Sequence, residues 1–200
     1  MHRSRLLALS SLAFLVSSSA SANLLVNATF ESDLSGWSEG GSPRWSSLDA
    51  AGSVLSGSVE VGTAGAVGQC IPVSTPELQV EASVLVPEGQ SQLVGTPGVK
   101  LLYYTAADCT LVPVIPGRSV VLAPLSTTGW EEIGDSITVP NGAVSAYVSL
   151  TFFYLLDGEA APFVAYFDDV SVVPEPGVAA LWALAGMFAA SGRRQPGARR

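Results

Sequence analysis

The stretch Val144-Ser-Ala-Tyr-Val-Ser-Leu-Thr-Phe-Phe-Tyr154 decides the fold of this 200-residue chain. Its apolar side chains fall at every second position, and mostly polar ones stand between them. Successive side chains of a β-strand point to opposite faces, so a period of two predicts a strand with one buried face. The stretch 78–86 repeats the pattern, with leucine, valine and alanine alternating with glutamine, glutamate and serine.

Other short apolar runs are separated by turn signals such as Pro87-Glu-Gly89, Pro116-Gly117 and Asp157-Gly158. The further candidate strands are 24–26, 57–61, 67–73, 99–105, 119–123, 131–139 and 163–173. No stretch from residue 23 to residue 173 has the 3.6-residue period of a long helix. Eight or nine short strands at this spacing predict one all-β sandwich or barrel.

The first 22 residues have the features of a secretory signal peptide. Arg3 and Arg5 precede an apolar run from Leu6 to Val16, and Ala20-Ser-Ala22 fits a small-x-small cleavage site. The apolar run is too short to span a bilayer, which favours cleavage over an uncleaved anchor. We therefore expect cleavage between Ala22 and Asn23 and an exported chain.

The last 27 residues, 174–200, are predicted to form a second targeting segment. Val173-Pro174-Glu175-Pro176 is followed by sixteen uncharged residues, 177–192, and then by a tail with four arginines. A helix of that length measures about 24 Å, less than the hydrocarbon core of about 30 Å, so it predicts a marginal transmembrane helix. The arginines would stay cytoplasmic by the positive-inside rule. A plain C-terminal anchor is the alternative.

This end resembles the PEP-CTERM sorting signal of Gram-negative bacteria that make exopolysaccharide. The resemblance rests on the Val-Pro-Glu-Pro motif, the short apolar segment and the basic end, in that order. It implies an exosortase-type partner that recognises Pro174-Glu175-Pro176 and cleaves nearby. The protein would be held briefly in the inner membrane and would then reach the cell surface or the medium. Gln195-Pro196-Gly197 departs from the family pattern by interrupting the basic tail.

Charge is distributed unevenly along the chain. Between residues 23 and 173 there are sixteen acidic residues and three basic ones, Arg44, Lys100 and Arg118, a net charge of −13. Nucleic-acid binding depends on basic side chains that neutralise phosphates, so this domain is not expected to bind nucleic acid. Anionic lipid surfaces would repel it as well.

Two segments resemble galactose-binding-like jelly-roll domains, a class that includes many carbohydrate-binding modules of bacterial glycoside hydrolases. They are Asn23-Leu-Leu-Val-Asn-Ala-Thr-Phe-Glu31 with Gly36-Trp37, and Ala165-Tyr-Phe-Asp-Asp-Val-Ser-Val172. The resemblance implies one jelly-roll β-sandwich over residues 23–173. Ala28 stands where the family usually has glycine.

Asp168 is the strongest candidate for a functional residue on the expected last strand. If Val170 and Val172 point into the core, Asp168 lies on the same face, and a buried carboxylate needs a partner. Calcium would fit an exported protein, and the resemblance implies a structural Ca²⁺ with Glu31 and Asp168 as carboxylate ligands. In the alternative, Asp168 caps a turn or accepts backbone N–H bonds.

Cys70 and Cys109 would lie in an oxidising compartment after export, where two cysteines more often form a disulfide than bind a metal. Closing this loop stabilises a fold by about 4 kcal/mol on the chain-entropy model. Two separately buried thiols are the alternative.

Trp45 lies in the polar stretch 42–47 and is expected to be exposed, as an ordinary surface aromatic or as a platform that stacks on a sugar ring. A sugar platform needs further aromatic side chains. The possible partners are Tyr103, Tyr104, Tyr147 and Tyr154.

Catalytic residues are scarce. The single histidine, His2, leaves with the signal peptide, and the adjacent acids Glu131-Glu132 and Asp168-Asp169 point to opposite faces of a strand. We therefore expect no enzyme but an exported surface or matrix protein with a structural or adhesive role in the envelope or biofilm. The alternative is a carbohydrate-binding module that recognises a specific glycan.

Overall fold

The computed structural model describes residues 22–63, 65–90, 95–110, 113–124, 127–153 and 163–175. The predicted signal peptide up to residue 21, Pro176 and the predicted transmembrane helix 177–192 lie outside these residues. Where the structure describes the chain, it contains no helix with the length and apolar character needed to cross a membrane.

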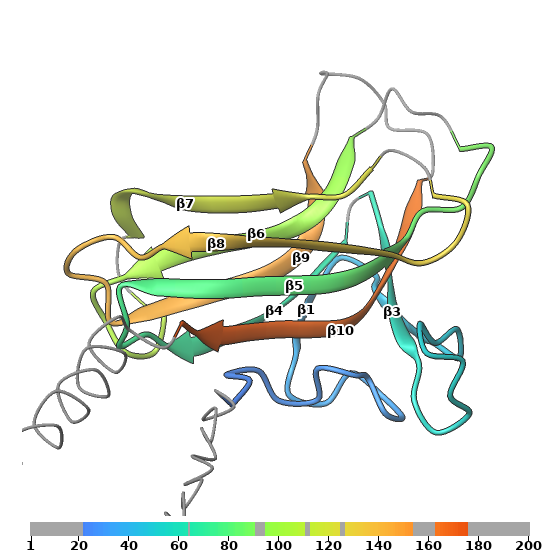
Figure 1. Cartoon of the computed structure of the whole chain (residues 1–200), viewed down its shortest axis with the longest axis horizontal. Helices are drawn as coiled ribbons and strands as arrows, with labels where there is room; N and C mark the ends of the chain where they lie inside the picture. Colours follow the sequence, from blue (N-terminus) through green and yellow to red (C-terminus); the bar gives the residue numbers. More distant parts are fainter. Residues whose placement is uncertain are drawn as a thin grey trace, which may run out of the picture.

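The described residues form ten β-strands in two five-stranded antiparallel sheets (Figure 1). Sheet A has the order β1-β4-β9-β6-β7, and sheet B has the order β2-β3-β10-β5-β8. The strands are β1 (Ser38–Gly40), β2 (Arg44–Ser46), β3 (Ser58–Gly62), β4 (Ala66–Pro72), β5 (Glu77–Leu85), β6 (Thr96–Tyr104), β7 (Pro113–Leu122), β8 (Glu131–Thr138), β9 (Ser145–Phe153) and β10 (Val164–Pro174). The predicted all-β sandwich is confirmed.

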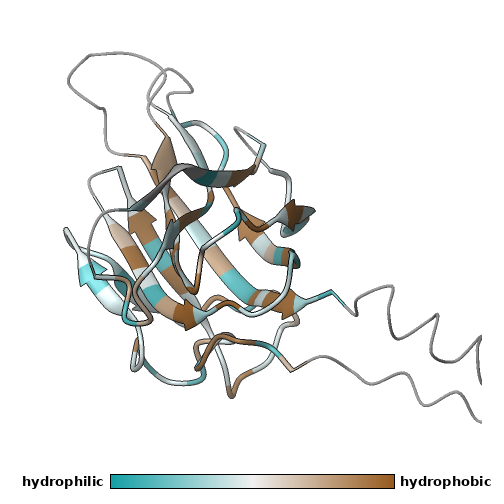
Figure 2. Cartoon of the chain, turned by 90° about the vertical axis from the view of Figure 1, so that its left-hand side faces the viewer, coloured by the Kyte–Doolittle hydropathy of each residue, from teal (hydrophilic) through white to brown (hydrophobic). Residues whose placement is uncertain are grey.

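The core lies between the two sheets and is built by the alternating strands. On β9, Ala146, Val148 and Leu150 are fully buried, and on β5 Leu78 and Val80 are fully buried. Figure 2 shows apolar and polar positions alternating along the strands. Burying a valine or leucine side chain stabilises a fold by roughly 1.5–3 kcal/mol, so the period of two supplies the main driving force here.

The N-terminal segment packs against the last strand but is not a regular strand itself, so the expected strand 24–26 is wrong. The Leu24 N–H donates to the Val172 carbonyl at 2.9 Å. The Asn23 side chain bonds the backbone of Val170 and Val172, at 2.8 and 3.0 Å. These side-chain bonds replace the ladder that a paired strand would make.

Strand β10 contains an irregularity that the sequence pattern hides. Its pairing with β5 shifts between Asp168 and Ser171, and Asp169 has a φ of 47°. Before the shift Ala165 and Phe167 face the core, whereas after it Val170 and Val172 do. The expected common face of Asp168, Val170 and Val172 is therefore wrong, because a bulge changes the phase of the strand.

Candidate functional site

The outer face of sheet A presents side chains in rows that run across the strands. In one row Cys70, Tyr147, Leu102 and Arg118 stand opposite one another on β4, β9, β6 and β7. The next row holds Gly68, Ser149, Lys100 and Val120 on the same strands. Residues in register point to the same side of a sheet, so both rows face outward, away from the core.

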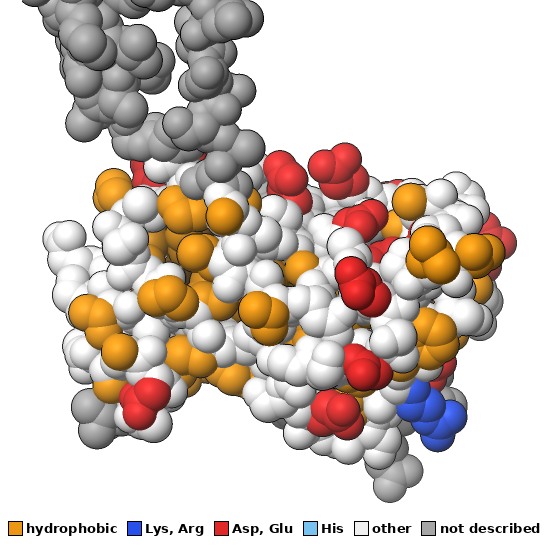
Figure 3. Space-filling view, turned by 90° about the horizontal axis from the view of Figure 1, so that it is seen from below, with side chains coloured by type: hydrophobic (Ala, Val, Ile, Leu, Met, Phe, Trp, Pro, Cys, Tyr) orange, Lys and Arg blue, Asp and Glu red, His pale blue; other side chains and the backbone are white. Residues whose placement is uncertain are grey.

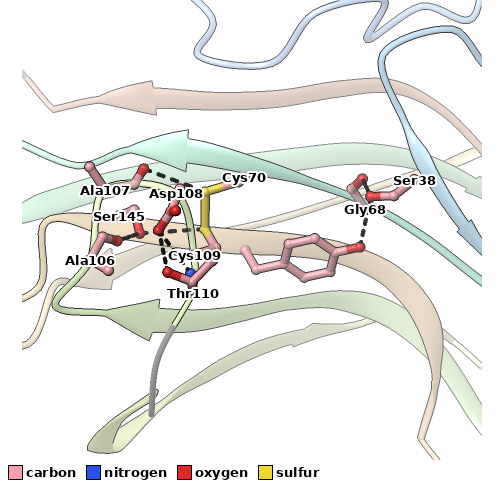
Figure 4. The surroundings of a disulfide bond; sticks show 10 residues. Ser38, Gly68, Cys70, Ala106, Ala107, Asp108, Cys109, Thr110 and Ser145 are labelled. Carbon is pink, nitrogen blue, oxygen red and sulfur yellow. Dashed lines mark hydrogen bonds between the residues drawn. A yellow bond between two sulfur atoms is a disulfide. The ribbon is translucent and has the colours of Figure 1, made fainter.

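Tyr147 is fixed in the middle of this face. A Cβ atom on Gly68 would lie 2.6 Å from the Tyr147 ring, so the ring rests directly on the β4 backbone. The Tyr147 hydroxyl lies 3.1 Å from Ser38 Oγ on β1, and Ser38 Oγ donates to the Gly68 carbonyl at 2.8 Å. Figure 4 shows Ser38 beside Gly68. The glycine and the serine together hold the ring flat across two strands.

Two further aromatic side chains lie toward the ends of the same face. Tyr104 is half-buried, opposite Ser145 and two positions from Leu102. Phe153 is half-buried, with its ring edge 3.3 Å from where a Cβ of Gly98 would stand. The rings of Tyr104, Tyr147 and Phe153 therefore lie on one sheet face.

The disulfide between Cys70 and Cys109 forms a boundary of this face, and its predicted pairing is confirmed (Figure 4). The Cα atoms are 5.8 Å apart, so the bond ties the loop after β6 to strand β4. Ser145 Oγ donates to the Ala106 carbonyl in the same loop. In that loop the pKa of Asp108 is lowered, because the hydroxyl and N–H of Thr110 donate to its carboxylate.

Trp45 lies on the other sheet, in β2, and is 39% exposed. Its Nε1–H donates to the Phe30 carbonyl at 2.8 Å, and its ring lies against Gly57. The structure therefore separates Trp45 from Tyr104 and Tyr147, which stand on sheet A. Of its other expected partners, Tyr103 is buried in the core and Tyr154 lies outside the described residues.

Asp168 is 1% exposed and accepts two backbone N–H bonds, from Ala50 at 2.8 Å and from Asp169 at 2.7 Å. It stands opposite Ser83, on the outer side of sheet B, beneath the loop after β2. Burial raises its pKa to about 6, although the two N–H donors act in the opposite direction. The burial that we expected is confirmed, but it arises from the covering loop and not from the core.

This arrangement offers few free carboxylate oxygens to a calcium ion. Glu31 is exposed, and Asp168 already accepts N–H bonds on both oxygens. Among the residues that the structure describes, no three His, Cys, Asp or Glu side chains gather closely enough to hold a metal ion. Any Ca²⁺ bound by Glu31 and Asp168 would need backbone carbonyls for most of its shell, so this site stays a prediction.

The described part of the expected sorting motif belongs to the folded domain. Val173 and Pro174 pair with β5, and the Glu175 N–H donates to the Glu77 carbonyl at 3.2 Å. Ser136 Oγ donates to the Glu175 carboxylate. The pKa of Glu77 is raised, because its carboxyl shares a hydrogen bond with the Glu175 carboxylate and is repelled by that charge when ionised. At the other end, exposed Ala22 precedes Asn23, which is the first of the described residues to bond the domain.

Known structures with a similar fold include carbohydrate-binding modules and parts of enzyme chains. The CBM22-1 xylan-binding domain of Paenibacillus barcinonensis Xyn10C superposes with a TM-score of 0.54 at 11% identity, over 77% of this chain and 95% of that chain. The CBM22-1–GH10 modules of Clostridium thermocellum xylanase 10B give 0.52 at 17% identity, over 76% of this chain and 28% of that one. The enzymatically active domain of bacteriophage CBA120 tailspike protein 4 gives 0.54 at 12%, over 76% and 21%.

These similarities define the class of fold, a β-sandwich shared with carbohydrate-binding modules. This chain spans between a fifth and a third of the tailspike and xylanase chains, so it matches one domain of each. No family model matches the sequence, and no curated protein matches it significantly.

Proposed function

We propose that this protein binds a carbohydrate and that the outer face of sheet A receives it. The observation that carries the proposal is the Tyr147 ring, held flat over Gly68 in the middle of that face. Its anchoring by Ser38 orders the ring before any ligand arrives, which lowers the entropic cost of binding.

The surroundings of Tyr147 suit a sugar. A pyranose presents apolar C–H groups on its ring faces and hydroxyl groups around its edge. Aromatic rings pack against the C–H faces of a sugar. Lys100 and Arg118 supply N–H donors for its hydroxyl groups. The xylan-binding domain with the same fold supports this assignment.

A binding role fits the face better than a catalytic one. Glycoside hydrolysis requires two carboxyl groups that flank the scissile bond. In the strands described for sheet A, Glu39 on the edge strand β1 is the single acidic residue. We therefore include in the proposal that this chain is not itself an enzyme.

The proposal also retains export and PEP-CTERM sorting by an exosortase-type enzyme. The Cys70–Cys109 disulfide supports an oxidising compartment. Among the described residues the first hydrogen bonds to the domain come from Asn23, and cleavage after Ala22 would keep them. On the cell surface, a structural or adhesive role in the envelope or biofilm would follow from glycan binding.

Affinity electrophoresis of the exported chain through gels that contain xylan, galactan or bacterial exopolysaccharide tests this function. We expect at least one polymer to retard the protein. Tyr147→Ala should weaken binding about tenfold, as expected for removing an aromatic anchor worth more than 1 kcal/mol. Trp45→Ala is the matched control and should change the retardation little.

Two results would contradict the proposal. If no polysaccharide retards the wild-type protein, carbohydrate binding is wrong. If Trp45→Ala abolishes retardation while Tyr147→Ala does not, the ligand binds at sheet B and the assigned face is wrong.

A further inference from the structure

The strands of the two sheets differ in charge. In the strands described for sheet A, Lys100 and Arg118 accompany the one acidic residue Glu39. The strands of sheet B contain one basic residue, Arg44, and eight acidic ones. The eight are Glu60, Glu77, Glu81, Glu131, Glu132, Asp135, Asp168 and Asp169. Two of the three basic residues between positions 23 and 173 therefore occupy the sheet that has almost no acidic residues.

Lys100 and Arg118 are close neighbours on the outer face. Lys100 stands opposite Val120, and Arg118 stands opposite Leu102, so the two cations are diagonal neighbours on β6 and β7. Diagonal pairs lie about 7–8 Å apart at the backbone, within reach for two long side chains. On the other side of β6, Lys100 faces Ser149. The ladder thus places only uncharged residues directly opposite the two cations.

From this arrangement we propose that the outer face of sheet A binds an acidic polysaccharide, and that Lys100 and Arg118 hold one of its anionic groups. The inference rests on the proposed function and adds the class of glycan. A guanidinium group binds a carboxylate or sulfate through two parallel N–H bonds, and an ammonium group adds a point charge. Such charge-assisted bonds are about twice as strong as neutral ones.

The position of Tyr147 indicates a polymer as the ligand. Tyr147, Leu102 and Arg118 lie in one row on β9, β6 and β7, so Tyr147 and Arg118 are separated by two strand spacings, about 10 Å. This distance is larger than one sugar ring. If one sugar stacks on Tyr147, the anionic group near Arg118 therefore belongs to a neighbouring sugar unit of the same polysaccharide.

The remaining acidic groups restrict a polyanion to this face. Glu39 lies on β1, at the edge of sheet A opposite β7, and Asp108 lies in the disulfide loop. Acidic side chains are prominent on the surface seen from below, where few basic atoms appear (Figure 3). Sheet B would repel a polyanion, so among the described strands the β6–β7 side of sheet A is the part that attracts it.

The test compares polygalacturonate with its fully methyl-esterified form, using the full exported chain and isothermal titration calorimetry. Esterification removes the charge and keeps the backbone of the polymer. We expect at least tenfold weaker binding to the ester, and weaker binding to polygalacturonate at 0.5 M salt than at 0.02 M because salt screens exposed charges. A sulfated galactan serves as a further arm, and tighter binding to it would identify sulfate as the anionic group.

Charge-removing variants locate the site. Lys100→Gln and Arg118→Gln should each weaken binding several-fold, and Arg118→Lys should weaken it by less than Arg118→Gln. Arg44→Gln removes the same charge from sheet B and should leave affinity unchanged. These side chains lie at the surface, and an unchanged Tm would show that each variant is folded.

The outcomes separate this inference from the proposed function. Equal affinity for the acid and the ester, or equal loss of affinity in Arg44→Gln, overturns the acidic-glycan inference and leaves carbohydrate binding intact. Failure to bind these polymers and also xylan, galactan and exopolysaccharide overturns both.

Discussion

The outer faces of sheets A and B are built by the same alternating pattern but carry different side chains. Sheet A presents tyrosines, small residues and two cations, and it is tied to a loop by a disulfide. Sheet B carries most of the acidic residues of the strands, is covered in part by the loop after β2, and is flanked along β10 by the N-terminal segment. One periodicity thus forms both faces of the sandwich, while the outward positions decide which face can bind a ligand.

The largest effect that would test this comparison comes from the disulfide of sheet A. Replacing both Cys70 and Cys109 by serine should lower the free energy of unfolding by about 4 kcal/mol. Chemical denaturation measures this change. Reductant added to the wild-type protein should reproduce it, and a stability insensitive to both treatments would contradict the role of the disulfide.

Sheet B should show the next effect, through the buried carboxyl of Asp168. Its folded-state pKa of about 6 lies above 3.8, the ordinary pKa of an aspartate, so the folded state keeps the proton to higher pH than the unfolded state. Stability should therefore fall as the pH rises from about 4 to 6, by at most about 3 kcal/mol. Asp168→Asn should remove this slope, which thermal unfolding across that pH range measures.

The same titration tests the predicted calcium site. Bound Ca²⁺ would favour the ionised carboxylate and lower the pKa of Asp168, so calcium should raise Tm more at pH 7 than at pH 4. A Tm that neither calcium nor chelator changes at pH 7 would contradict the site at Glu31 and Asp168.

A smaller effect concerns the ordering of Tyr147. Gly68→Val places side-chain atoms where the Tyr147 ring now lies and should lower stability by about 1–3 kcal/mol, with loss of glycan binding. Gly129→Ala, where a Cβ meets open space, is the matched control. Retained binding in a folded Gly68→Val protein would show that the flat position of Tyr147 is not needed.

The smallest effect is expected where the sorting motif leaves sheet B. The Glu175 carboxylate raises the pKa of Glu77, so this pair opposes folding when both groups are ionised. Glu77→Gln should therefore raise Tm slightly at pH 7, and this gain should disappear as the pH falls and Glu77 becomes protonated. A Tm lowered at pH 7 would show that Glu77 stabilises the end of β10.

Alternation along the chain was enough to predict the sandwich and most of its strands. It located β9 because Ala146, Val148 and Leu150 keep one phase throughout the strand. It placed Asp168 on the same face as Val170 and Val172, because the alternation does not reveal a bulge and only the pairing with β5 shows where it occurs. The strands β1 and β2 were missed because three residues are too few to display a period.

The candidate site was predicted only in part. Tyr104 and Tyr147 were named as aromatic partners, but their place on one face depends on the register between β6 and β9, which the sequence does not contain. The pairing of Cys70 and Cys109 was predictable because two cysteines allow one bond. The contact of Tyr147 with Gly68 joins residues 79 positions apart, and a glycine in a strand was its only available signal.

The bonds between Asn23 and β10 have a consequence for how this domain can be connected to other chains. Asn23 and Val172 are hydrogen-bonded neighbours, and Glu175, the last described residue, follows three positions later, so the two ends of the described domain lie close together. A short peptide could join these two points, and new ends could be opened at an exposed turn such as Asn141-Gly142, without separating either sheet. The unit is thus suited to insertion into a loop of a host protein, because its two ends can connect to neighbouring points of that loop.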